Sequence, residues 1–256
     1  MSRKLTLKEI EESVRSFTPD KALERLYILR EDYGEKLKSL IVKYEKKKES
    51  YLKEINRFMA MCEYEKEAYT KGCKLIAGID EAGRGPLAGP VVAAAVILPE
   101  NVFIEGLNDS KKLSEKKRNE LFHIIREKAI SVSVGMVDEK QIDEINILNA
   151  AKKAMESAVK GLDKKPDLLL IDAVELKGID ISQKPIIKGD ALSISIAAAS
   201  VIAKVTRDAI MNEMDKLYPC YGFIKHKGYG TSEHITSIKK YGICPIHRLS
   251  FVKNIV

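Results

Sequence analysis

Two adjacent carboxylates, Asp80 and Glu81, stand where the apolar segment "KLIAGID" ends and a glycine-rich stretch begins. A third acid, Asp172, follows the apolar run "DLLLI", and a fourth, Asp190, precedes a long segment of small residues. Ligand sites of open α/β sheets lie beyond strand ends, and carboxylates gathered there repel one another. A divalent cation such as Mg²⁺ relieves that repulsion, because it takes oxygen ligands and partners with phosphates. The four acids therefore predict a site where two metal ions clamp the oxygens exchanged in phosphoryl transfer.

Two of these acids also have simpler interpretations. Asp190 could be the N-cap of the helix that follows it, and Asp172 could merely end a strand. The adjacent pair is harder to explain without a metal, since neighbouring side chains of a strand point to opposite faces. Asp80 and Glu81 reach one site only near a strand end, where the backbone bends.

The glycine-rich turn after the acids, "GRGPLA", has the spacing of a dinucleotide-binding loop. That motif must open a helix after a strand, whereas here Pro90 and the strand-like run "VVAAAVIL" follow. Acids before the turn would also repel a pyrophosphate. The residues instead favour close approach of a ligand to bare backbone, with Arg84 and N–H groups beside the metal site holding a phosphate and a sugar hydroxyl.

Basic, hydroxyl and aromatic residues elsewhere are typical of contact with a nucleic acid. Lys111 lies in the basic stretch "NDSKKLSEKKR", and Tyr229 stands between two glycines, where an exposed ring could stack on a sugar or base. Helical spacing places on one face Asp190, Ser193, Ala197, Ser200, Lys204 and Arg207. This face could contact a phosphate backbone through Ser200 and Lys204, or it could simply pack against another helix.

Composition limits the class of protein. The chain has 256 residues, 45% of them hydrophobic, and a net charge of +7, which suits a polyanionic partner. Its four cysteines form no CxxC pair, and no G-x-S-x-G motif of a serine hydrolase is present. The N-terminus is charged and no apolar run reaches about 20 residues. We expect a cytoplasmic protein with reduced thiols and no membrane segment.

The pattern of apolar residues divides the chain near residue 70. Residues 1–70 contain one glycine and one proline and predict a helical extension, with one long helix from about 35 to 69. Its role stays open between a solvated spacer and an arm that contacts nucleic acid. Residues 71–256 alternate between strand and helix and predict a mixed α/β domain with a C-terminal helical part. Strands are expected at 74–80, 89–98, 129–137 and 167–174, the first two antiparallel, and helices at 114–128, 146–162, 191–217 and 232–241.

Long motifs in a fixed order resemble those of prokaryotic ribonuclease HII. They are "GIDEAGRGPLAGPVVAAAVIL", "DSKKLS", "IDAVELKG", "KGDALSISIAAASVIAKVTRD" and "HKGYGT", and the likeness spans roughly residues 74–251. The related ribonuclease HIII lacks the arginine of the turn and carries a sheet-rich N-terminal domain. Arg84 and the helical N-terminus are therefore similar to the HII type.

This resemblance implies an RNase H-like fold, in which helices flank a mixed central sheet. It implies hydrolysis of the RNA strand of RNA–DNA hybrids and incision 5′ of single ribonucleotides embedded in duplex DNA. Cleavage would use two Mg²⁺ or Mn²⁺ ions, leave a 3′-hydroxyl and a 5′-phosphate, and serve ribonucleotide removal in DNA repair and RNA primer removal in replication. We expect a monomer without an organic cofactor.

The resemblance also implies roles for single residues. Asp80, Glu81, Asp172 and Asp190 match the family's acidic metal ligands. Gly83, Arg84 and Gly85 match the turn that senses the 2′-hydroxyl at the RNA–DNA junction, and Tyr229 matches a tyrosine that stacks on the neighbouring deoxyribose. Two other readings remain: a different nuclease of similar fold, such as a junction resolvase, and a noncatalytic hybrid-binding protein.

Overall fold

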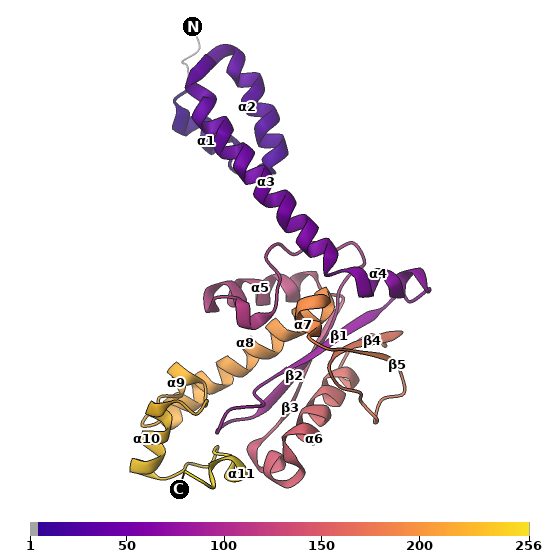
Figure 1. The fold of residues 1–256 in the computed structure, drawn as a ribbon, viewed down its shortest axis with the longest axis vertical. Helices are drawn as coiled ribbons and strands as arrows, with labels where there is room; N and C mark the ends of the chain where they lie inside the picture. The colour runs from indigo at the N-terminus through magenta and orange to yellow at the C-terminus, as the bar shows by residue number, and fades with distance from the viewer. Residues whose placement is uncertain (1–4, 256) are drawn as a thin grey trace. The chain divides into compact units, whose positions relative to one another are not determined.

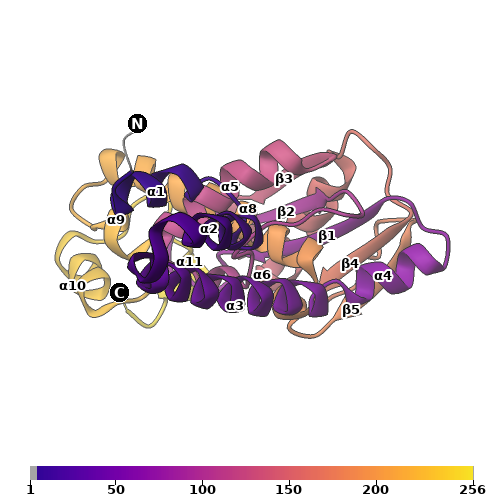
Figure 2. The ribbon, with the colours of Figure 1, turned by 90° about the horizontal axis from the view of Figure 1, so that it is seen from above.

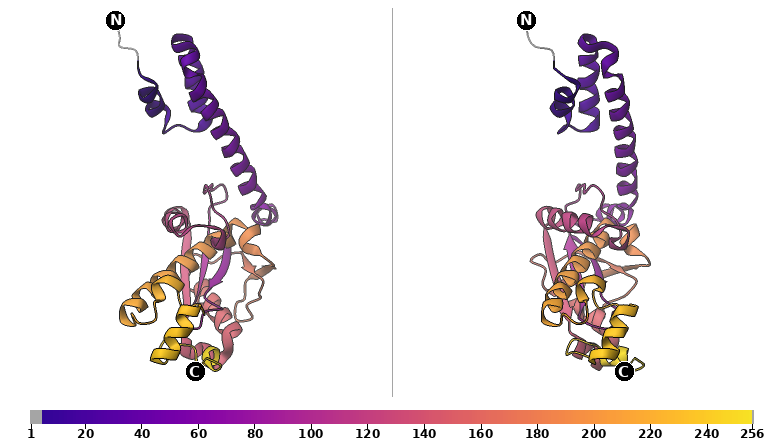
Figure 3. Two further views of the ribbon diagram at one scale, coloured as in Figure 1. Left: turned by 60° about the vertical axis from the view of Figure 1, so that its left-hand side comes forward. Right: turned by 90° about the vertical axis from the view of Figure 1, so that its left-hand side faces the viewer.

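Residues 5–255 are described by the computed structural model, and the chain divides into two compact units, one reaching to Met59 and one beginning at Ala60. We expected the boundary near residue 70. The first unit contains α1 (Leu7–Val14), α2 (Pro19–Tyr33), the 3-10 turn η1 (Gly34–Leu37) and α3 (Lys38–Ala60). Within this unit, α2 and α3 form an antiparallel hairpin (Figure 3).

The helices of the first unit begin and pack as their sequence predicts. Pro19 stands in the first turn of α2, where its missing N–H leaves no bond unmade. The unit has a core of its own, because α1, α2 and the first half of α3 each bury one apolar stripe. The core residues are Ile10, Val14, Ala22, Leu23, Leu26, Leu37, Leu40, Ile41 and Tyr44.

The prediction of one helix from 35 to 69 is wrong, because the helix is interrupted between Ala60 and Glu63. After this break, α4 (Glu63–Thr70) packs in the second unit, where Ala68 joins a core cluster with Ile76. Buried Glu65 fixes α4 to the start of the longest helix of this unit. Its Oε1 accepts hydrogen bonds from Ser193 Oγ at 2.6 Å and from the Ser195 N–H at 3.0 Å.

The second unit is built on a five-stranded mixed sheet in the order β3-β2-β1-β4-β5. Its strands are β1 (Ile76–Ala82), β2 (Val91–Ile97), β3 (Ser131–Val137), β4 (Leu168–Asp172) and β5 (Ser182–Ile186). The predicted antiparallel pairing of the first two strands is confirmed, with Asp80 opposite Ala94. β4 runs parallel to β1, so the carboxyl ends of these two strands lie at one edge of the sheet.

Helices cover both faces of the sheet (Figures 1 and 2). α6 (Glu139–Lys160) lies on one face, whereas α8 (Ile194–Leu217) and α5 (Glu115–Lys128) lie on the other. Every residue of β2 is buried as a result. Gly78 allows α8 to lie close to β1, because a Cβ there would stand 2.0 Å from the Ser195 carbonyl carbon. The predicted RNase H-like architecture is confirmed.

Two helix starts differ from the prediction. α6 begins at Glu139, and the expected start at Asn146 is a break inside it, where this residue adopts φ 64°. The Asn146 side chain still caps the second half, because its Oδ1 accepts the N–H of Leu148 at 3.1 Å. Ser193 rather than Asp190 is the N-cap of α8, with its Oγ accepting the Ile196 N–H at 3.2 Å. The remaining helical segments are η2 (Ser110–Lys112), α7 (Gly189–Leu192), α9 (Phe223–His226), α10 (Ser232–Tyr241) and α11 (Leu249–Val252).

Candidate active site

The four predicted acids come from three elements that meet at one edge of the sheet. Asp80 and Glu81 lie near the end of β1, and Asp172 is the last residue of the parallel neighbour β4. Asp190 lies in α7, which is fixed to β4 because the Gly189 N–H donates to Asp172 Oδ1 at 2.8 Å. Asp80 is buried, with 3% of its surface exposed.

The electrostatics of this edge are those of carboxylates short of positive charge. Burial raises the pKa of Asp80 well above its usual value, and the charges of Glu81 and Asp172 raise it further. Burial also raises the pKa of Glu81 and of Asp190, with Asp172 adding to both shifts. Such mutual perturbation in a partly enclosed place is typical of functional sites. The charges of these acids therefore act on one another, as the sequence predicted.

Two basic side chains offset part of this charge. Lys111 Nζ lies 3.3 Å from Asp190 Oδ2, and Arg84 Nη1 lies 3.4 Å from Glu81 Oε1. The Lys111 side chain is 78% exposed, so its ammonium group lies at the rim of the acid cluster. The cluster, meaning Asp80, Glu81, Asp172 and Asp190, keeps an excess of negative charge.

The donor set fits a hard divalent cation. Carboxylate oxygens are the ligands that Mg²⁺ and Mn²⁺ prefer, and a cation would reverse the repulsion that raises these pKa values. Among residues 5–255, no three Asp, Glu, His or Cys side chains converge tightly enough to hold a metal ion as they stand. Binding would therefore require the carboxylates of the cluster to turn toward the ion.

A glycine-rich turn, residues 83–90, joins β1 to β2 directly after the acids. Gly83 adopts φ +98°, and a Cβ there would stand 2.1 Å from Arg207 Nε, so the fold itself demands glycine. Gly85 has no positive φ, and its Cβ would meet only Tyr229 Cε1, at an ordinary 3.8 Å. Because the fold does not require glycine at 85, its bare backbone suits close approach of a ligand.

Tyr229 lies next to this turn and is 43% exposed, as its place between two glycines predicted. The Leu87 N–H donates to the Gly228 carbonyl at 2.8 Å. This bond connects the turn to the loop of residues 227–231, which carries Tyr229 and is called the tyrosine loop below. The structure therefore brings together Gly85, Arg84 and Tyr229 beside the acid cluster.

The helix face expected to contact nucleic acid is largely internal. Ser200 is buried, and its Oγ lies 2.8 Å from Ser110 Oγ, with its hydroxyl also bonded to Asp80. Lys204 pairs with Asp208 at 2.7 Å. Arg207 on the same face is also internal, because its guanidinium is buried and donates to backbone carbonyls, so this part of the face follows the packing alternative.

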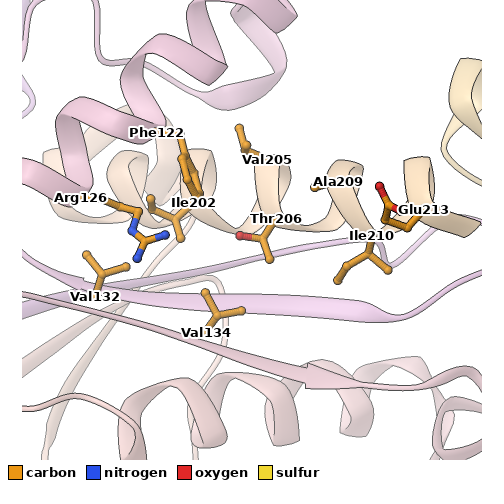
Figure 4. A pocket seen from close by; sticks show the side chains of 10 residues that line it. All are labelled: Phe122, Arg126, Val132, Val134, Ile202, Val205, Thr206, Ala209, Ile210 and Glu213. Atoms are coloured by element: carbon orange, nitrogen blue, oxygen red, sulfur yellow. The ribbon is translucent and has the colours of Figure 1, made fainter.

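An apolar groove of about 570 Å³ lies elsewhere, between α5, α8 and β3 (Figure 4). Its walls come from side chains such as Phe122, Val134 and Ile210, with Arg126 and Glu213 at its margins. None of the predicted site residues lines it.

Comparison with known proteins decides the family. A sequence model of ribonuclease HII matches residues 77–254, and a model of the ribonuclease HII N-terminal domain matches residues 6–69. The chain belongs to the ribonuclease HII family. Ribonuclease HII of Acetivibrio thermocellus is 66% identical over 252 residues, 98% of either chain. Ribonuclease HII of Ruminiclostridium cellulolyticum is 55% identical over 252 residues, again 98% of either chain.

A solved structure supports the same conclusion. The crystal structure of ribonuclease H2 from Pyrococcus horikoshii OT3 is similar with a TM-score of 0.60 and 30% identity, covering 71% of this chain and 96% of that one. Membership of the ribonuclease HII family makes this chain a nuclease of the RNase H type, acting on RNA–DNA hybrids with divalent metal. In the part of the chain that the structure describes, no helix is long and apolar enough to cross a membrane.

Three residues around the site were not predicted from the sequence. Ser110 holds Ser200, Arg248 donates to carbonyls of the turn, and His234 Nδ1 donates to the Tyr229 carbonyl. Arg248 is a single arginine near the C-terminus, and nothing in its neighbourhood distinguishes it from a surface residue. A buried role could have been guessed only for His234, which lies on the apolar side of a predicted helix.

Proposed function

We propose that this chain incises duplex DNA 5′ of single ribonucleotides and hydrolyses the RNA strand of hybrids, leaving a 3′-hydroxyl and a 5′-phosphate. The observation that supports this most directly is the adjacency of the acid cluster and the bare turn. Asp80 and Glu81 precede Gly83 to Gly85 without an intervening element. If the scissile phosphate binds at the acid cluster, the sugar bonded to it would therefore lie beside the turn.

Metal ions would bind at the acid cluster, which supplies four carboxylates. When bound, two ions of Mg²⁺ or Mn²⁺ would supply the positive charge that stabilises phosphoryl transfer. Ser200 would keep Asp80 oriented through its hydroxyl, while Lys111 would contact a phosphate, since its ammonium lies at the rim. Lys204, paired with Asp208, would contribute charge to the same nucleic-acid surface.

Selection of RNA would take place at the turn. The N–H groups of Arg84 and Gly85 make no hydrogen bond within residues 5–255, so they are available to a 2′-hydroxyl. That hydroxyl is both donor and acceptor, and it is the group that separates RNA from DNA. Tyr229, exposed beside Gly85, would stack on the neighbouring deoxyribose.

The test uses two duplexes that differ by one 2′-hydroxyl. We expect Mg²⁺-dependent cleavage of the duplex with one ribonucleotide, with the all-DNA duplex left intact. Arg84→Ala keeps the backbone N–H but removes the guanidinium, which would contact a phosphate beside the sugar. Cleavage at that ribonucleotide should therefore slow by about 10- to 100-fold, the loss expected for a charge-assisted hydrogen bond. Arg126→Ala, which removes one positive charge at the groove of α5, is the matched control. Equal cleavage of both duplexes by the unaltered enzyme would refute the proposal.

Such an activity would serve removal of ribonucleotides in DNA repair and of RNA primers in replication. We further propose that the helical N-terminal segment is separable from the catalytic part. A chain beginning at Ala60 keeps α4 and its Glu65 bonds, which a cut at residue 70 would remove. If the segment contacts substrate, this shortened chain should bind hybrid more weakly, and its affinity should depend less on salt. A spacer predicts unchanged affinity.

A further inference from the structure

Two arginines of the second unit are buried without a carboxylate partner. Arg207 is 1% exposed and Arg248 is 0% exposed, and within residues 5–255 neither forms an ion pair. A buried charge is costly unless hydrogen bonds satisfy it. The question is therefore which groups receive their donors, and why the fold retains two such charges near the substrate side.

Among residues 5–255, the guanidinium of Arg248 donates to carbonyls of the glycine-rich turn alone. Its Nη2 lies 2.6 Å from the Gly83 carbonyl, and its Nη1 lies 3.1 Å from that of Arg84 and 2.9 Å from that of Pro86. Its Nε donates to the Gly89 carbonyl at 2.9 Å. One side chain from the C-terminal segment thus gathers carbonyls from both ends of the turn.

Arg207 binds the far side of the same turn and joins it to the tyrosine loop. Its Nε donates to the Pro90 carbonyl at 2.9 Å, and its Nη2 donates to that of Ala88 at 3.0 Å. Its Nη1 donates to the Lys227 carbonyl at 2.9 Å, and its guanidinium carbon lies 5.9 Å from the centre of the Tyr229 ring.

These bonds divide the backbone groups of the turn into those that are hydrogen-bonded within the protein and those that are available to a ligand. Six carbonyls of the turn accept from the two guanidinium groups, while the N–H groups of Leu87 and Gly89 bond to neighbouring segments. The N–H groups of Arg84 and Gly85 are left available. We propose that Arg207 and Arg248 are positioning residues that fix the turn so that these two N–H groups select a 2′-hydroxyl. This proposal rests on the proposed function of the turn.

Lysine could not replace either arginine in this role. The planar guanidinium offers five donors in a fixed fork, whereas an ammonium is a compact charge with three. Glycine at position 83 is required for this arrangement, because any side chain there would displace the Arg207 guanidinium. Arginine and glycine, distant in sequence, therefore specify one rigid backbone conformation.

The experiment compares Arg248→Lys and Arg207→Lys with the unaltered enzyme on two substrates. One is duplex DNA with a single ribonucleotide, which depends on selection at one sugar. The other is a continuous RNA–DNA hybrid, which offers many sites. For each variant the ratio of kcat/KM on the two substrates is measured below its melting temperature. We expect the ratio of kcat/KM for the single ribonucleotide to kcat/KM for the hybrid to fall at least tenfold, because cleavage of the hybrid should be reduced much less.

The control is Met155→Ala, a buried residue in the second half of α6, on the opposite face of the sheet from α8. It should lower the melting temperature without changing the ratio, because it does not touch the turn. Should a lysine variant fail to fold, hydrogen exchange of residues 83–90 in the other variant gives a second measure. Faster exchange there than in the unaltered enzyme, with exchange in α5 unchanged, supports the positioning role.

The outcomes separate the two proposals. If the unaltered enzyme does not distinguish the single ribonucleotide from DNA, the proposed function itself fails. If it does, but both lysine variants keep the normal ratio and normal exchange in the turn, the positioning role is refuted. Adding Arg248→Lys to Arg84→Ala should change the ratio less than the separate effects predict, because both act through one turn.

Discussion

The acid cluster and the turn of residues 83–90 are neighbours in the chain, yet the protein satisfies their polar groups very differently. In the cluster, neighbouring carboxylate charges and burial raise the pKa of Asp80, Glu81 and Asp190, and the positive charge offsetting them comes from Lys111 and Arg84, 3.3 and 3.4 Å away. In the turn, Arg207 and Arg248 together supply donors to carbonyls along its whole length. The cluster is left in need of an external cation, whereas the backbone of the turn is held in place before any ligand binds.

This difference separates two requirements of a nuclease that selects one sugar. Charge placed for metal binding costs folding stability, which the ligand restores when it binds. A recognition surface must instead keep its shape in the free protein, since disorder there would reduce discrimination. The comparison predicts opposite responses to substitution in the two regions.

Asp80→Asn should produce the largest effect and the clearest contrast. Loss of one ligand charge should reduce Mg²⁺-dependent cleavage by on the order of 10³-fold, equivalent to about 4 kcal/mol of barrier. The same change should raise the melting temperature without divalent metal by a few degrees, because it removes a repelled buried charge. Cleavage rates, hybrid affinity and thermal unfolding with and without Mg²⁺ check both parts.

The control for that variant is Asp180→Asn, an exposed acid preceding β5, at the opposite end of the sheet. It should leave activity, stability and the Mg²⁺-induced rise in melting temperature unchanged. An Asp80→Asn enzyme that cleaves at the normal rate, or that is less stable than the unaltered protein, would contradict this account of the cluster.

Two glycines of the turn should respond in opposite ways to the same substitution. Gly83→Ala should destabilise the fold by about 2–4 kcal/mol, because it strains a positive φ and displaces Arg207. Gly85→Ala should leave the melting temperature within about 1 °C, since its Cβ meets only ordinary contact. Cleavage at a single ribonucleotide should nevertheless fall about tenfold, equivalent to about 1.4 kcal/mol, in Gly85→Ala.

Thermal unfolding and single-ribonucleotide cleavage of the two variants form the test, each serving as the other's control. Equal loss of stability in both would show that the bare backbone at Gly85 serves the fold. Full activity in Gly85→Ala would remove this residue from substrate contact.

The sequence was sufficient for features that depend on local pattern. A strand end near Asp80, a strand end at Asp172, the antiparallel first pair and the helix start near Ser114 follow from periodicity and capping chemistry. It failed where distant segments decide the outcome. The helix of residues 35–69 breaks because Glu65 and Ala68 have partners in the second unit, which no helical periodicity records.

The same limit explains why the sequence did not predict the role of Arg207. Spacing placed it correctly on a face with Ser200, but spacing does not say what lies opposite that face. The partners are backbone carbonyls of residues 88 and 90, over a hundred positions earlier, and carbonyls carry no sequence signature. The role of Arg248 could not be predicted from the sequence for the same reason. Residues that position a backbone are therefore harder to predict than residues that act through their own side chains.

Acidification should separate the two regions by a smaller effect, through the histidines behind the tyrosine loop. His234 is fully buried, its Nδ1 lies 2.9 Å from the Tyr229 carbonyl, and its Nε2 lies 3.1 Å from His247 Nε2. Burial lowers the pKa of His234 from 6.5 to about 4 and lowers that of His247 as well. Between these values the unfolded chain binds protons that the folded chain does not, so stability conferred by neutral histidines falls as pH falls from 6.5 toward 4.

The acid cluster has the opposite sign, because carboxylates with raised pKa values regain neutrality as pH falls. His234→Gln should therefore flatten the loss of stability below pH 6.5 by up to about 1.4 kcal/mol per pH unit. The exposed His123→Gln should not. Urea unfolding of each variant from pH 4.5 to 7.5 measures these slopes. If the free energy of unfolding of His234→Gln depends on pH as it does in the unaltered protein, protonation of His234 does not control stability below pH 6.5.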